Sequence, residues 1–208
     1  LLRGASWAPF LVLLGVYLTL HFVLRLLGSA SLEFDEAEQF LLVQTLAQGY
    51  NTQPPLLTWC FWGLSQILGE SLATLTLLRL GFLGLAYFFL YASARLLLRD
   101  PRRALLVAAS LLLIPAIGWE AICDRVHTTK LCALCLATLY VTLQVLHDGR
   151  RRWFLFLGVC LGLGMLCKYN YALFALALLL ATFSLPAYRN RLLTRQLIWT
   201  IAAALPLV

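Results

Sequence analysis

The stretch of sequence most suited to chemistry is a cluster of acids after the first long apolar run. Glu33, Asp35, Glu36 and Glu38 are four of the nine acids in the chain. A positioned carboxylate can remove the proton of an attacking hydroxyl group, so these residues are candidates for a general base. A structural alternative is that Asp35 caps a helix, a position that Asp favours. Residues 39–48 alternate with a near-helical period, which predicts an amphipathic helix on a membrane surface.

Basic residues form a second group of candidates. Lys168 and Tyr169 follow an apolar run, and a fixed cation there could stabilise negative charge that develops on a reacting group. The alternative for Lys168 is that its side chain extends to the membrane interface. Arg79 lies inside an apolar run, where it either pairs with an acid such as Glu36 or Glu70, or binds an anionic group of a ligand through two N–H groups.

A third group lies near residue 125. Asp124 could bind acceptor hydroxyls or a metal ion, and Arg125 and His127 could contact a phosphate, although each could also be a solvated loop residue. We expect the nearby Cys132 and Cys135 to be small buried residues and not metal ligands, because closed zinc sites have four regularly spaced ligands. The sequence therefore predicts no metal site and no cofactor, with a divalent ion kept as an alternative.

The composition indicates the kind of protein that positions these residues. Of the 208 residues, 62% are hydrophobic and 12% are charged, and the mean hydropathy is +0.87. These values exclude an ordinary soluble domain and predict an all-α polytopic membrane protein. The net charge of +7 does not indicate nucleic-acid binding, because the basic residues form short clusters between apolar runs. The last apolar run continues to Val208, so we expect a fragment of a longer chain.

Apolar runs about as long as a bilayer is thick predict seven spans. The segment 55–68 is too short to cross and lies in an outer loop, 28–71, whose tryptophans suit an interface. The predicted spans are 7–27, 72–94, 104–120, 129–146, 153–167, 171–187 and 196–208, the last of them truncated.

The distribution of basic residues predicts the orientation of these spans. With a cytoplasmic amino terminus, eleven of the sixteen basic residues lie on the cytoplasmic side, as the positive-inside rule requires. The acidic cluster, the 120–130 segment and Lys168 then share the outer face. The eleven residues are Arg3, Arg95, Arg99, Arg102, Arg103, Arg150, Arg151, Arg152, Arg189, Arg191 and Arg195.

Several of these residues recur, in the same order, in a known superfamily. The chain resembles the GT-C membrane glycosyltransferases that use polyprenyl-phosphate sugars, and most of all the bacterial branch that decorates lipopolysaccharide. It departs from their pattern at Gln53, where a His or similar residue is expected, and at Arg125 and His127, where a more apolar continuation is expected. The motifs are Asp35-Glu36, Gly49-Tyr50, Gln53-Pro54-Pro55-Leu56, Leu78-Arg79-Leu80, Asp124, Gly164 and Lys168-Tyr169.

The resemblance implies a GT-C-like helical bundle, of which residues 1–208 form the amino-terminal part of the transmembrane glycosyltransferase domain. It also implies an inverting transfer of a sugar from a polyprenyl-phosphate donor to a lipid, glycan or protein acceptor. The implied place is the bacterial inner membrane, among membrane lipids, with the site facing the periplasm. The implied catalytic residues are Asp35 as base, Glu36 as its orienting neighbour or acceptor contact, and Asp124; the implied substrate contacts are Lys168, Tyr169, Arg79, Arg125, His127 and Gln53.

Three other functions fit the sequence less well. A protein O-mannosyltransferase belongs to the same superfamily and differs in its acceptor. A transporter or flippase of an anionic lipid-linked solute would use Lys168 and Arg79 to bind the head group. Such a protein should carry its polar groups near the middle of broken helices, whereas the acids here are predicted at an outer edge. A non-catalytic partner subunit would require the acids to be replaceable.

Overall fold

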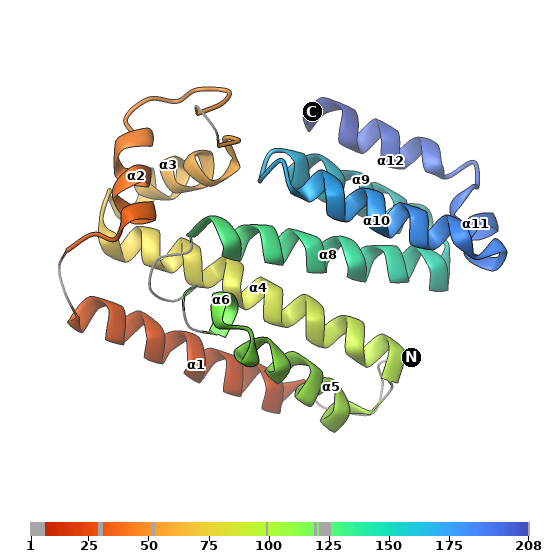
Figure 1. Ribbon diagram of the computed structural model, residues 1–208, viewed down its shortest axis with the longest axis horizontal. Coiled ribbons are helices and arrows are strands. Elements are labelled where there is room, and N and C mark those ends of the chain that lie inside the picture. The colour runs from red at the N-terminus through yellow and green to blue at the C-terminus, as the bar shows by residue number, and fades with distance from the viewer. Residues whose placement is uncertain are drawn as a thin grey trace. The chain divides into compact units, whose positions relative to one another are not determined.

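The computed structural model describes residues 7–28, 31–50, 53–98, 100–118, 120 and 126–207 (Figure 1). The described residues form helices and no β-strand, apart from an isolated bridge between Tyr50 and Gln53. This confirms the predicted all-α class. The chain divides into two compact units, one of Leu1–Leu46 with Thr58–Ala133 and one of Ala47–Leu57 with Leu134–Val208.

The first unit is built around two long helices, α1 and α4, that pack through aromatic side chains. Phe10 stacks on Tyr91 with the ring centroids 4.0 Å apart. A Cβ atom at Gly84 would lie 2.9 Å from the Leu18 side chain, so the glycine permits a close approach of the two helices. The elements of this unit are α1 (Ala8–Leu27), α2 (Phe34–Leu42), most of α3 (Leu56–Leu68), α4 (Leu72–Leu98), α5 (Pro101–Ala109), the 3-10 helix η1 (Ser110–Leu113), α6 (Pro115–Gly118) and the start of α8 (Val126–Asp148).

The second unit holds the rest of α8 and the helices that follow it. Gly158 and Gly162 stand four residues apart on α9, where small residues allow helix backbones to come close. A Cβ atom at Gly158 would lie 2.2 Å from the Thr200 carbonyl oxygen of α12, and α9 and α12 lie side by side (Figure 1). The further elements are α9 (Arg151–Met165), α10 (Tyr171–Ser184), α11 (Pro186–Leu192), α12 (Leu197–Ala204) and the 3-10 helix η2 (Leu205–Leu207).

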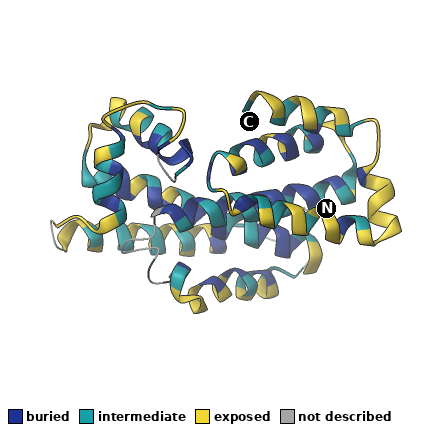
Figure 2. Cartoon of the chain, turned by 45° about the horizontal axis from the view of Figure 1, so that its top comes forward, coloured by how far each residue is buried: buried dark blue, intermediate teal, exposed yellow. Residues whose placement is uncertain are grey.

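Three of the described helices are long and apolar enough to cross a membrane, and α10 with α11 makes a fourth candidate that bends by 115°. Many residues of the helices are exposed (Figure 2), and they include apolar residues such as Val12 and Val16 on α1, each 63% exposed. Such surfaces suit lipid, so the polytopic membrane class is confirmed. The three helices are Ala8–Leu27, Leu72–Leu98 and His127–Asp148.

The run 104–120 differs from the single helix expected there. It forms α5, η1 and α6, with a break at Ile114, whose backbone is extended (φ −91°, ψ 109°). The residue before a proline is driven out of the helical region by the proline ring, and Pro115 follows. The runs 153–167 and 196–208 form α9 and α12 with η2, which are shorter than a typical span.

Candidate functional site

The acidic cluster forms the start of α2. Glu33 is the N-cap, and the Glu33 and Glu36 side chains each bind the other residue's backbone N–H in a capping box. The N-cap is therefore Glu33 and not Asp35, which lies in the first helical turn. The capping box places the start of the helix before the acids instead of after them, and the helix ends at Leu42, earlier than the predicted amphipathic segment 39–48.

Glu36 is the buried centre of an ion-pair network. Its side chain is fully buried and accepts hydrogen bonds from Arg25 Nη2 at 2.5 Å and Arg79 Nη1 at 3.0 Å. Arg25 Nε adds a third contact at 3.2 Å. Pairing with an acid was one of the two roles left open for Arg79, and the structure contains that pair. These contacts tie the start of α2 to the end of α1 and to α4.

Asp35 and Glu38 lie three residues apart on α2, a spacing that places them on one face of a helix. His127 from the first turn of α8 meets them there, with its Nε2 atom 3.0 Å from Glu38 Oε2. One potential ligand atom from each of the three residues lies within 4.8 Å of the others. His127 is 5% exposed, whereas Asp35 and Glu38 are only partly buried, so a substrate can reach the two carboxylates.

This cluster has two chemical capabilities. A partly buried carboxylate beside a second carboxylate and an imidazole can take a proton from a bound hydroxyl group. Two carboxylates and an imidazole are also suitable ligands for a divalent cation, and three protein ligands would leave positions open for a substrate. The sequence predicted His127 as a phosphate contact and named Glu38 only as a member of the acidic cluster. Their approach across 89 residues of chain has no signal in the local sequence.

Asp124 and Arg125 lie outside the described residues, so their predicted roles are not tested by the structure. His127, in the described part of the same segment, is the second residue of α8.

Lys168 and Tyr169 occupy the turn between α9 and α10, and the contacts of Tyr171 hold this turn in place. The Tyr171 ring is fully buried, and its hydroxyl lies 2.6 Å from Thr138 Oγ1 and 3.2 Å from the Cys160 carbonyl oxygen. A Cβ atom at Gly164 would lie 2.1 Å from this ring. Only glycine fits there, which gives a structural reason for the glycine that precedes Lys168 by four residues.

The segment with Gln53 is joined to the same turn. The Leu56 backbone N–H donates to the Leu166 carbonyl at 3.1 Å, and Gln53 exchanges two backbone hydrogen bonds with Tyr50. Among the described residues, none donates a hydrogen bond to the buried side-chain oxygen of Gln53. Lys168 is partly buried and Tyr169 is 64% exposed. The second unit thus brings the segment of Gln53 to the turn that holds Lys168 and Tyr169.

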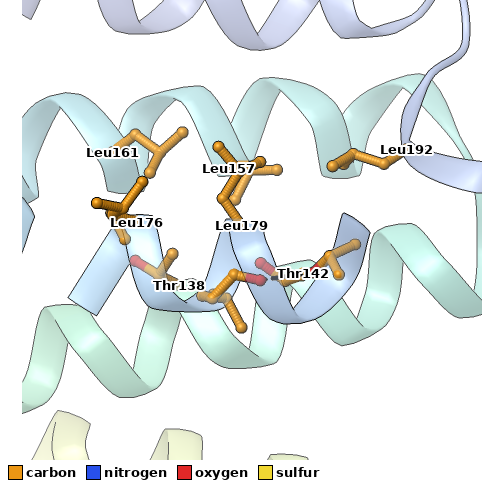
Figure 3. A pocket seen from close by; sticks show the side chains of 10 residues that line it. Thr138, Thr142, Leu157, Leu161, Leu176, Leu179 and Leu192 are labelled. Atoms are coloured by element: carbon orange, nitrogen blue, oxygen red, sulfur yellow. Dashed lines mark hydrogen bonds between the residues drawn. The ribbon is translucent and has the colours of Figure 1, made fainter. Parts of the chain in front are cut away.

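An apolar cavity of about 200 Å³ also lies in the second unit. It is bounded by α8, α9, α10 and α11, with Thr138 and Thr142 on one side and mostly leucines around the rest (Figure 3). None of the predicted site residues lines it. Its lining suits a hydrocarbon group and offers little to bind a sugar or a phosphate.

Comparison with known proteins gives an independent view of these motifs. Residues 52–208 match the family model described as dolichyl-phosphate-mannose-protein mannosyltransferase. The lipopolysaccharide core galacturonosyltransferase RgtB of Rhizobium johnstonii is 34% identical over 98% of this chain and 41% of its own length. RgtA of the same organism, with the same description, is 32% identical over 95% of this chain and 40% of its own length. The chain thus spans about 41% of the first of these relatives. No solved structure matches it.

Proposed function

We propose that this chain, which belongs to the dolichyl-phosphate-mannose-protein mannosyltransferase family and to a bacterial lipopolysaccharide-decorating branch of the GT-C glycosyltransferases, supplies catalytic residues of an inverting sugar transfer. The donor is a polyprenyl-phosphate sugar, and the acceptor is a hydroxyl group of lipopolysaccharide. The names of the two relatives favour galacturonic acid as the sugar. The reaction takes place at the periplasmic face of the inner membrane.

In the proposed reaction, an acceptor hydroxyl oxygen attacks the anomeric carbon of the sugar. The bond from that carbon to the phosphate oxygen breaks, and the polyprenyl phosphate leaves with the electron pair. Asp35 takes the proton of the hydroxyl group as the new bond forms. A single displacement of this kind inverts the anomeric centre.

The observation that carries this proposal is the contrast between two adjacent carboxylates. Glu36 is fully buried and bound by Arg25 and Arg79, so its oxygens are occupied. Asp35, the next residue, turns to the partly exposed side, beside Glu38 and His127. Glu36 is therefore proposed to position α2 and thereby Asp35, with Arg79 acting through Glu36.

The proposed donor contacts lie around the turn of the second unit. Lys168 would place a cation near the departing phosphate, with Tyr169 as a hydrogen-bonding neighbour and Gln53 as a further polar contact. In support, Lys168 makes no side-chain hydrogen bond or ion pair with any described residue, so its ammonium group is available to a ligand. Asp124 is proposed to bind the acceptor and Arg125 a phosphate.

The test is turnover of a labelled polyprenyl-phosphate galacturonic acid by the purified full-length enzyme, comparing the parent with Asp35→Asn. Turnover should fall at least about a hundredfold, since a general base contributes roughly 10²–10⁴-fold. Donor binding and the unfolding midpoint should stay close to those of the parent.

The matched control is Glu70→Gln, which changes an exposed acid that has no side-chain partner among the described residues. Its turnover should equal that of the parent. Parental turnover in Asp35→Asn would remove Asp35 from the role of base. Passage of the intact donor across the membrane without product would favour the transporter alternative.

A further inference from the structure

We propose that one end of the second unit binds the head groups of anionic phospholipids. The binding surface, here called the arginine surface, lies at the ends of α8, α9, α11 and α12 and takes no part in the proposed sugar transfer. Asp148 is the single acid between residues 134 and 208, so the positive charge of this surface is largely uncompensated. The six arginines of the surface are Arg150, Arg151, Arg152, Arg189, Arg191 and Arg195.

Contacts between the helices bring these arginines together. Arg191 of α11 donates a hydrogen bond to the Leu146 carbonyl near the end of α8, where a cation is also favoured by the helix dipole. Leu192 packs into an apolar cluster with Val145 and Phe154. The Arg151 guanidinium carbon lies 3.3 Å from the centre of the Trp199 ring of α12. Arg151 and Arg191 therefore have structural contacts that hold the surface together.

The bend between α10 and α11 gives the surface its shape. The chain turns by 115° there, so α11 runs across the end of α10 and does not prolong it. Leu185, Tyr188 and Leu193 are 51%, 44% and 54% exposed. Exposed leucine and tyrosine beside arginine is the composition of a segment at a membrane interface, where apolar groups enter the lipid and basic groups meet the head groups.

The remaining four arginines can bind an anionic ligand. Arg150 and Arg152 share Asp148, at 2.9 Å and 3.7 Å. Arg189 and Arg195 are exposed and make no side-chain hydrogen bond or ion pair with any residue that the structure describes. Guanidinium groups bind phosphate oxygens in a bidentate manner, and clusters of basic residues beside membrane helices bind anionic head groups. The apolar residues beside them favour a lipid over a free phosphate or a nucleic acid.

The test uses the full-length protein in a neutral detergent, titrated with phosphatidylglycerol and followed by native mass spectrometry. The variant is Arg189→Gln with Arg195→Gln, which removes two guanidinium groups that make no hydrogen bond or ion pair with any described residue. Each basic residue near an anionic surface contributes roughly a fivefold gain in affinity, so the double variant should bind phosphatidylglycerol about 25-fold more weakly. Phosphatidylcholine binding should not change.

The control is Arg102→Gln with Arg103→Gln, which makes the same change of charge on α5, where both side chains are exposed. This variant should bind phosphatidylglycerol like the parent. An unchanged affinity in Arg189→Gln with Arg195→Gln would overturn the proposal, as would an equal loss in the control. Competition by inorganic phosphate at the same concentration as the lipid would also overturn it, because the surface would then bind any phosphate anion.

Discussion

Replacing Glu36 by Gln tests the most constrained part of the candidate site. The substitution keeps the shape of the side chain and removes its negative charge. Arg79 is 1% exposed and Arg25 is 11% exposed, so both guanidinium groups would lose the compensating carboxylate charge in a place that water hardly reaches. The new amide NH₂ group would also face arginine N–H donors, with which it cannot form a hydrogen bond.

The size of the effect follows from this burial. Breaking a buried ion pair by removing one partner costs about 3–5 kcal/mol, because it leaves an uncompensated buried charge. Folded domains have a free energy of unfolding of only about 5–15 kcal/mol, so Glu36→Gln should lose a large share of it. The backbone N–H of Glu33 donates a hydrogen bond to the Glu36 side chain at 3.1 Å. It can still donate to the side-chain oxygen of the glutamine, so the capping of α2 should survive.

The measurement is the free energy of unfolding of the full-length protein in detergent micelles. Asp100→Asn is a matched control, because it makes the same carboxylate-to-amide change in a pair with Arg103 whose side chains are 42% and 76% exposed. Exposed pairs contribute about 0–1 kcal/mol, and Asn is as good an N-cap as Asp. If Glu36→Gln lost no more stability than Asp100→Asn, the network would not hold α2 in the way argued above.

Three further predictions concern other parts of the chain. Gly158→Ala should lower the unfolding free energy by about 1–3 kcal/mol through a clash with α12, whereas Gly63→Ala, with no atom within 4 Å of the added Cβ, should not destabilise; equal effects would contradict the close packing. Burial raises the pKa of the Cys60 thiol, so the pH at which its alkylation reaches half the maximal rate should lie above the ordinary thiol pKa. Peptide mass spectrometry measures this rate, and a midpoint below the ordinary thiol pKa would contradict the burial of Cys60. His127→Gln should reduce turnover without weakening donor binding, and full turnover would separate the imidazole from catalysis.

The long apolar helices could be predicted from the sequence because hydrophobicity and length alone determine them. The predicted spans 7–27 and 72–94 coincide with most of α1 and α4. The run 104–120 looked equally apolar, but Pro115 interrupts it, and a count of apolar residues gives a single proline little weight. The start of α2 was missed because the capping box uses Glu33 at the N-cap, where Ser, Thr, Asp or Asn is the usual signal.

The candidate site was harder to predict because its contacts join distant parts of the chain. A buried arginine needs an acid, so a partner for Arg79 was expected, and Glu36 was one of two candidates. Arg25 was not expected at the same carboxylate, because nothing in the local sequence indicates that the end of α1 approaches α2. The approach of His127 to Glu38 across 89 residues likewise depends on how α8 packs against α2.

The contact between Gly164 and Tyr171 has a consequence for how the Lys168 turn responds to a ligand. With the aromatic ring seated against the α9 backbone, the chain from residue 164 to residue 171 has few alternative conformations to give up when a substrate arrives. A larger residue at position 164 would displace the Tyr171 ring and make the loop flexible. Binding would then carry an entropic penalty, and the loss would appear as weaker donor affinity even though every polar side chain was still present.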